Sequence, residues 1–144
     1  MTQGQSLDVL CAVDSNCEGK STRPAARTYR ELVAWQVSMD LLAELYRLAT
    51  RLPAVERYGI GTQVRRAALS IPLNIAEGFA RRNRRDFARF LLIAEGSLRE
   101  VQTLLEAMVL LRYVARSDAE TATNTANRVG FLLHRLRRSL RDAP

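Results

Sequence analysis

Side chains that bind metals are scarce in this sequence. The chain has one histidine, His134, and two cysteines, Cys11 and Cys17, which we interpret as reduced thiols in a loose segment. Zinc sites need about four such ligands, and di-metal sites in helical bundles use paired Glu-x-x-His motifs, whereas Phe131 stands three residues before His134. No phosphate-binding glycine loop and no Ser/His/Asp or Cys/His set occurs. We therefore expect no metal, no cofactor and no enzymatic activity.

Long apolar runs are also absent. No run approaches the roughly 20 residues that a membrane span requires. The first residues, MTQGQSLDVLCAV, have no basic segment, and Asp8 interrupts their short apolar stretch, so no export signal is expected. We expect a soluble, cytoplasmic protein without a membrane partner. Hydrophobic residues still make up 47% of the 144 residues, which suits one domain with one modest core.

Positive charge is in excess, and its position matters more than its size. The formal net charge is +7, and arginine supplies 21 of the 22 basic residues. Basic and acidic residues balance within residues 1–28, so the excess lies in the rest of the chain. Such charge favours nucleic acid, an anionic membrane surface or an acidic protein as partner. The preference for arginine fits phosphate recognition, and it fits a codon bias equally well.

Apolar residues recur at three- and four-residue steps in four segments, which predicts four helices. The first helix follows Thr28, whose spacing to Glu31 fits a capping box, and ends before Pro53. The second has its apolar stripe over residues 64–79. Both segments carry enough periodic apolar residues to bury one face.

The other two helices have similar start signals. Asn83 is a suitable N-cap for a third helix whose stripe covers residues 87–108. Ser117 and Glu120 fit another capping box, before a stripe over residues 122–140. No strand pattern interrupts these segments. We predict an all-α fold, an antiparallel up-and-down four-helix bundle over residues 29–142, preceded by a flexible tail of residues 1–28.

The second and third helices are apolar on more than one face. The additional apolar residues are Leu69, Leu73 and Ala76 in the second helix, and Leu92, Ile93, Leu104 and Leu110 in the third. A helix that is apolar over most of its circumference needs a second burial surface. In so short a chain another subunit is the simplest source, which predicts a homo-oligomer.

The stretch SIPLNIAEG, residues 70–78, places polar residues, a proline and a glycine inside the second helix. Its polar residues belong to a line at helical spacing: Gln63, Arg66, Ser70, Asn74, Glu77 and Arg81. Such a line can hydrogen-bond across a helix contact, and Ser70 can offset the backbone bond that Pro72 lacks. Gly78 and Gly96 are expected where a neighbouring backbone comes close.

Glu77 and Glu95 are the two glutamates that could be considered as a general acid and a general base. Glu95 stands four residues before Arg99, which predicts an ordinary ion pair on one helix surface. We therefore interpret Glu77 and Glu95 as structural carboxylates, consistent with a protein that is not an enzyme.

The segment YGIGTQVRRAALSIPLNIAEGFARRNRRDFARFLLIAEGSLREVQTLL, residues 58–105, resembles the family of four-helix bundle proteins encoded in intervening sequences of 23S ribosomal RNA genes, the S23-type proteins. The matching motif residues are Gln63, Arg65, Arg66, Ser70, Pro72, Asn74, Glu77, Gly78, Gly96, Ser97 and Glu100. The resemblance, over residues 29–115, implies a homo-oligomeric ring, typically a pentamer. It also implies a relation to bacterial accessory proteins of reverse transcriptases in diversity-generating retroelements.

Clustered arginines are the strongest binding signal. The candidate nucleic-acid-binding residues are Arg65, Arg66, Arg81, Arg82, Arg84, Arg85, Arg89, Arg135 and Arg138. Five of them surround the predicted turn at Asn83, where backbone N–H groups of the next helix would also favour an anion. A solvated turn explains these five arginines equally well, and compensation of the helix dipole explains the second basic run, HRLRRSLR at residues 134–141, equally well.

Two functions from different classes remain open. The first is an accessory protein that binds the backbone of RNA or DNA, with a reverse transcriptase or ribonucleoprotein as a further partner. The second is a protein–protein assembly scaffold whose arginines keep it soluble or bind an acidic partner.

Overall fold

The computed structural model describes residues 25–142, and this range is entirely helical apart from turns and connections. Four α-helices are joined by short connections. One short 3₁₀ helix precedes the first α-helix, and a second lies in the connection between the first two. In chain order the elements are η1 (Tyr29–Glu31), α1 (Val33–Ala49), η2 (Ala54–Glu56), α2 (Ile60–Ala80), α3 (Arg84–Leu110) and α4 (Arg116–Asp142). The prediction of an all-α fold with four helices is confirmed. No strand occurs between residues 25 and 142.

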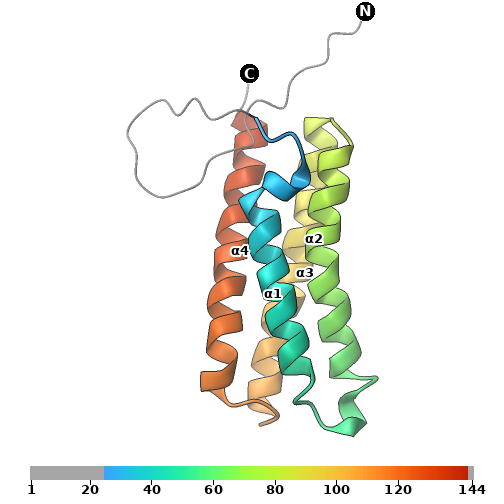
Figure 1. The fold of residues 1–144 in the computed structure, drawn as a ribbon, viewed down its shortest axis with the longest axis vertical. Coiled ribbons are helices and arrows are strands. Elements are labelled where there is room, and N and C mark those ends of the chain that lie inside the picture. The colour runs from blue at the N-terminus through green and yellow to red at the C-terminus, as the bar shows by residue number, and fades with distance from the viewer. Residues whose placement is uncertain (1–24, 143–144) are drawn as a thin grey trace, which may run out of the picture.

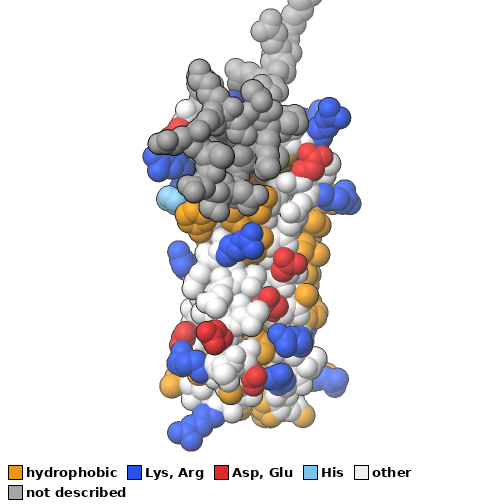
Figure 2. Space-filling view, turned by 60° about the vertical axis from the view of Figure 1, so that its left-hand side comes forward, with side chains coloured by type: hydrophobic (Ala, Val, Ile, Leu, Met, Phe, Trp, Pro, Cys, Tyr) orange, Lys and Arg blue, Asp and Glu red, His pale blue; other side chains and the backbone are white. Residues whose placement is uncertain are grey.

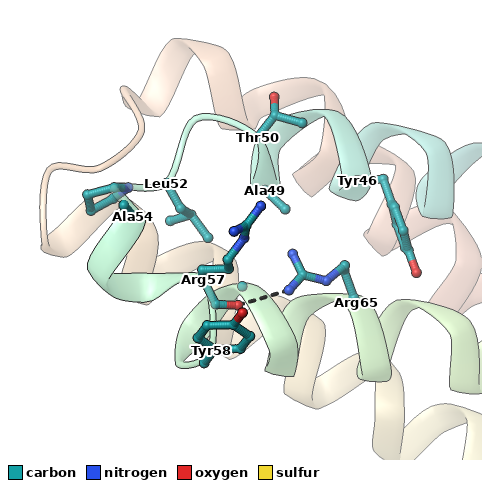
Figure 3. A pocket seen from close by; sticks show the side chains of 10 residues that line it. Tyr46, Ala49, Thr50, Leu52, Ala54, Arg57, Tyr58 and Arg65 are labelled. Atoms are coloured by element: carbon teal, nitrogen blue, oxygen red, sulfur yellow. Dashed lines mark hydrogen bonds between the residues drawn. The ribbon is translucent and has the colours of Figure 1, made fainter.

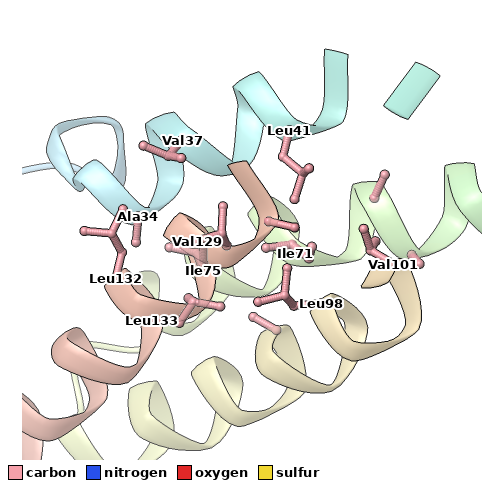
Figure 4. Packing of buried hydrophobic residues seen from close by; sticks show 14 of the residues in the cluster. Ala34, Val37, Leu41, Ile71, Ile75, Leu98, Val101, Val129, Leu132 and Leu133 are labelled. Atoms are coloured by element: carbon pink, nitrogen blue, oxygen red, sulfur yellow. The ribbon is translucent and has the colours of Figure 1, made fainter. Parts of the chain in front are cut away.

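The helices lie side by side with their axes roughly aligned, and in Figure 1 the chain runs down α1, up α2, down α3 and up α4. Each helix turns one apolar face toward a common core, as the side chains in Figure 4 show. Leu41, Ile71, Leu98 and Leu133 come from the four helices, and each is at most 1% exposed. Burying a side chain of this size stabilises the fold by about 1.5–3 kcal/mol. The bundle is thus held mainly by this shared core.

The start of the first helix differs from its prediction. Thr28 accepts a hydrogen bond at Oγ1 from the N–H of Arg30 at 3.1 Å, and the Glu31 carboxylate accepts one from the N–H of Arg27 at 2.9 Å. These bonds cap the 3₁₀ turn η1, and α1 begins only at Val33. The two residues form local bonds, but not the reciprocal capping box that their spacing predicts.

Helix α3 begins as predicted and α4 does not. Asn83 accepts hydrogen bonds at Oδ1 from the N–H groups of Arg85 and Asp86, at 2.9 and 3.2 Å, which confirms it as the N-cap. Helix α4 begins at Arg116, so Ser117 lies inside the first turn and the predicted capping box there is wrong. The carbonyl of Ala115, one residue before the helix, accepts its first backbone bonds.

The bundle has two ends with different elements. The turn end contains residues 25–32, the α2–α3 turn at 81–83 and the last turns of α4, whereas the loop end contains residues 50–59 and 111–115 (Figure 1). Ala26, which was assigned to the tail, is buried. Residues 1–24, with Cys11 and Cys17, lie outside the described residues. None of the helices in the described range is long and apolar enough to cross a membrane.

Candidate functional site

The polar residues of SIPLNIAEG join α2 to α3. The hydroxyl oxygens of Ser97 on α3 and Ser70 on α2 are 2.8 Å apart and hydrogen-bonded. The Asn74 side-chain amide donates to the carbonyl and the hydroxyl oxygen of Ser70, at 2.7 and 3.0 Å. The Ser70 hydroxyl therefore serves the contact between helices, instead of offsetting the bond missing at the buried Pro72. Such bonds give this helix pair a defined register.

The two motif glycines have different surroundings. A Cβ atom on Gly78 would lie 2.7 Å from both Cδ2 of Phe87 and Cβ of Phe90, so this position admits only glycine without movement of α3. A Cβ on Gly96 would meet nothing within 4 Å among the described residues. Within the described part of the chain, the expected close approach thus exists at Gly78 and does not exist at Gly96.

Gly96 belongs to an exposed apolar face on the outer side of α2 and α3. The face also contains Leu69, Leu73, Leu92 and Ile93, which are 39%, 62%, 52% and 44% exposed. Because these side chains lie on two helices in contact, they form a larger apolar surface than isolated exposed leucines would. We call these five residues the apolar face.

Five arginines from the predicted set lie at the α2–α3 turn. Arg81 is paired with Glu77 at 2.6 Å and also lies over the Phe90 ring, 5.3 Å from its centroid. The exposed Arg82, Arg85 and Arg89 form no ion pair with any residue in the range 25–142. Arg84, half-buried at the start of α3, completes this group: Arg81, Arg82, Arg84, Arg85 and Arg89.

Arginines near the end of α4 lie at the same end of the bundle. Arg135 lies over the exposed ring of Phe131, 5.4 Å from its centroid, and Arg138 is paired with Asp142 at 3.3 Å. Figure 2 shows basic side chains at both upper edges of the molecule, each with an acidic side chain beside it, and basic and acidic side chains also interspersed over the lower half. The arginines of the α2–α3 turn and those of α4 are about 50 residues apart in the sequence and lie at the same end of the bundle.

Two arginines of the predicted set do not belong there. Arg65 and Arg66 lie near the start of α2, and a rise of 1.5 Å per residue places them about 24 Å along the helix from Arg81. Arg65 Nη2 donates to the carbonyl oxygen of Arg57 at 2.9 Å. Gln63 is exposed on α2 and Glu100 on α3, and neither side chain forms a hydrogen bond within the described part of the chain. The predicted interface therefore divides into two regions.

The N-terminus of α3 does not offer the anion site expected from its backbone. Asn83 occupies the N–H groups of Arg85 and Asp86 through its side chain, and its carbonyl accepts from the N–H of Phe87 at 2.9 Å. The carboxylate of Asp86 also lies in this first turn. An anion at the turn end would consequently be held by arginine side chains.

The expected ion pair between Glu95 and Arg99 is wrong. Arg137 of α4 donates through Nε to Glu95 Oε1 at 2.9 Å, and both side chains are largely buried at this helix contact. Arg99 instead donates to Gln102 Oε1 at 2.7 Å. Glu77 is likewise paired with Arg81, so Glu77 and Glu95, the two candidates for an acid and a base, both have structural partners.

The loop end contains a hydrogen-bond network that the sequence did not predict. Glu56 Oε2 accepts from the N–H of Ile60 at 3.1 Å, capping α2, while Oε1 accepts from the Tyr113 hydroxyl at 3.0 Å. The bond to this carboxylate raises the pKa of Tyr113 above its usual 10.0, and partial burial and the negative charge of Glu56 act in the same direction. Nearby, Arg51 is paired with Asp118 at 2.7 Å.

Comparison with known proteins identifies relatives by sequence and by fold. Residues 30–135 match the family model described as 23S rRNA-intervening sequence protein. A crystal structure from Bacteroides thetaiotaomicron VPI-5482, described as a protein of unknown function from the S23 ribosomal protein family, is similar with a TM-score of 0.69 and 24% identity. The match covers 74% of this chain and 99% of that chain, and at this identity it shows the fold alone. Comparison with curated proteins gives no match.

Proposed function

The chain belongs to the family of 23S rRNA-intervening sequence proteins, and we propose that it is a non-enzymatic accessory protein that binds the nucleic-acid backbone with its turn end. The observation that carries this proposal is the presence of two arginine runs, from the α2–α3 turn and from α4, at the same end of the bundle. Guanidinium groups without carboxylate partners are suited to phosphate, which they bind through two parallel N–H donors.

The proposed binding mode is recognition of phosphates rather than of bases. Arg82, Arg85 and Arg89 are exposed and have no ion-pair partner among residues 25–142, so they can contact phosphates without breaking a bond in the protein. Proteins that contact the bases of a single strand rely on exposed aromatic rings on which the bases stack. At this end Phe131 is exposed, but its ring already lies under Arg135. Binding should therefore be strongly salt-dependent and tolerant of sequence.

Self-association through the apolar face is the second part of the proposal. A glycine on an exposed helix surface costs about 1 kcal/mol relative to alanine, and Gly96 has no neighbour in its own subunit that would require it. A helix of another subunit packed on Leu73, Ile93 and Gly96 would bury the exposed side chains and account for the glycine. We propose a homo-oligomeric ring of antiparallel bundles, with five subunits as in the family it resembles.

A ring would strengthen nucleic-acid binding without any new contact. Each subunit would present its turn end, so phosphate contacts on neighbouring subunits would bind the same strand with a high effective concentration. The proposed place of action is the cytoplasm, and a reverse transcriptase or another ribonucleoprotein component is the proposed protein partner.

The test measures binding of a fluorescently labelled structured RNA by anisotropy between about 50 and 200 mM salt, the range over which phosphate contacts weaken steeply. The triple variant Arg82→Glu/Arg85→Glu/Arg89→Glu should bind at least about tenfold more weakly, with a salt slope reduced by about 2 to 3. The control Arg47→Glu/Arg66→Glu/Arg128→Glu makes the same charge change at exposed positions elsewhere. Equal loss in both variants would mean that only net charge matters, and would reject the turn-end site.

The apolar face favours a second candidate, a protein–protein assembly scaffold. Under this alternative the oligomer forms and RNA does not bind even at low salt. Light scattering after size-exclusion chromatography, with and without RNA, separates the two. The single variant Leu73→Glu should dissociate the oligomer in either case, because it places a charge in the centre of the apolar face.

A further inference from the structure

The loop end has a pocket that the proposed function does not use. Its volume is about 700 Å³, within the range of small-molecule sites. The walls come from the end of α1, from η2 and from the start of α2 (Figure 3). The residues that line it include Tyr46, Leu52, Arg57, Tyr58, Gly61 and Arg65.

One of the two arginines in this pocket is held in place. Arg65 Nη2 donates to the backbone carbonyl of Arg57 at 2.9 Å, and this bond is drawn in Figure 3. A Cβ atom on Gly61 would lie 3.3 Å from Arg65 Nη1 and 3.0 Å from the carbonyl oxygen of Glu56. The glycine thus leaves room for the guanidinium, whose other N–H groups remain available to a ligand.

The charge of the pocket is positive and uncompensated. In Figure 3 the Arg57 and Arg65 side chains both extend toward the end of α1. No carboxylate lines the pocket, and neither arginine forms an ion pair with another residue of the described range. The adjacent carboxylate of Glu56 is already used by the N–H of Ile60 and the hydroxyl of Tyr113. Two neighbouring guanidinium groups match a ligand group with two negative charges.

The remaining walls are suited to a planar, partly apolar body. Tyr46 and Tyr58 contribute phenol rings from opposite sides of the pocket, with the two arginines between them, and Leu52 adds apolar surface to the lining. A phosphomonoester carries a charge near −2 at neutral pH, as the phosphate on a modified side chain does. We propose that this pocket binds a phosphomonoester attached to a planar base. The source is either a free nucleoside monophosphate or the 5′-phosphorylated end of a nucleic-acid strand.

The test is isothermal titration of the full chain with AMP. To exclude binding at the turn end, it is repeated in the Arg82→Glu/Arg85→Glu/Arg89→Glu background, which should leave AMP affinity unchanged. Arg57→Ala/Arg65→Ala should weaken AMP binding about tenfold or more, as expected when charge-assisted hydrogen bonds are lost. The matched control is Arg66→Ala, an exposed neighbour that does not line the pocket and should stay within about twofold of the wild type.

The single variant Arg57→Ala is the safeguard against misfolding, because it leaves the backbone carbonyl that accepts from Arg65 in place.

Adenosine and inorganic phosphate should each bind more weakly than AMP. A 5′-phosphorylated tetranucleotide that binds more tightly than AMP, with its 5′-hydroxyl form much weaker, identifies a strand end. Equal or tighter binding of AMP identifies a free nucleotide. Absence of AMP binding at millimolar concentration, phosphate as tight as AMP, or unchanged affinity in the double variant would overturn the assignment.

Discussion

The turn end and the loop end of the bundle use their polar and small residues differently. At the turn end, Gly78 lets α3 pack closely against α2, and several exposed arginines have no carboxylate partner among residues 25–142. At the loop end, Glu56 joins two connections through hydrogen bonds, and Arg51 is paired with Asp118. Close helix packing therefore stabilises the first end, and side-chain bonds between segments stabilise the second.

This difference shows how one residue type serves two purposes in a chain with a single excess charge. At the loop end, Arg51 is paired with a carboxylate and Arg65 donates to a backbone carbonyl, whereas Arg57 has no carboxylate partner within the described range. Arginines such as Arg85 at the turn end have positive neighbours instead, and their mutual repulsion slightly destabilises the fold. Binding of the proposed phosphate ligand would relieve this repulsion.

The largest expected effect is that of Gly78→Ala at the turn end. The added Cβ would lie 2.7 Å from the Phe87 ring and from Phe90 Cβ, and the latter cannot rotate away. We expect a loss of about 3 kcal/mol in the free energy of unfolding, at the upper end for overpacking. At the loop end, Gly61→Ala meets the flexible Arg65 and one carbonyl, and should stay within about 1 kcal/mol of the wild type. Urea unfolding followed by circular dichroism measures both, and equal losses would contradict the contrast between the ends.

The next effect is that of Glu56→Ala at the loop end. It removes both the cap of α2 and the partner of Tyr113, so we expect a loss of about 2 kcal/mol. The turn-end control is Glu77→Ala, which breaks only an exposed pair within one helix and should cost about 0.5 kcal/mol or less. The same unfolding measurement applies. A Glu56 variant as stable as the Glu77 variant would mean that the network does not stabilise the loop end.

A smaller difference is expected between two arginines. Arg51→Ala should cost up to about 1 kcal/mol, because its pair with Asp118 joins the α1–α2 connection to the first turn of α4 but both side chains are more than two-fifths exposed. Arg85→Ala should be neutral or slightly stabilising, since it removes repulsion and breaks no side-chain bond. A double-mutant cycle of Arg51 and Asp118 isolates the pair energy. A clear loss of stability in Arg85→Ala would instead assign that arginine a folding role.

The sequence predicted the helices well because their signals are local. Apolar periodicity and the Asn83 cap depend on residues within one or two turns, and the structure has four helices with that cap. Pairings between helices carry no such signal. The partner of Glu95 is Arg137, 42 residues away, and not Arg99 on the same helix.

The grouping of the candidate site failed for a similar reason. Arg65 and Arg81 belong to the same predicted binding set, but the 21-residue helix α2 places them at opposite ends of the bundle. Conversely, Arg85 and Arg138 are far apart in the sequence and lie at one end (Figure 1). Which charges share a surface depends on the direction of each helix, so spacing along the chain could not predict it.

The smallest effect is a pH dependence at the loop end. Because its bond to Glu56 raises the pKa of Tyr113 above 10.0, the stabilisation is complete below that pH and is lost as the pH rises through the folded-state pKa. The wild type should therefore lose more of its stability than Tyr113→Phe does between neutral pH and the range above 10.0, where the ionised phenol would face the Glu56 carboxylate. Parallel unfolding curves of the two proteins at each pH measure this difference. A gap in stability that stays constant above that pH would show that the hydroxyl of Tyr113 does not bond to Glu56 in solution.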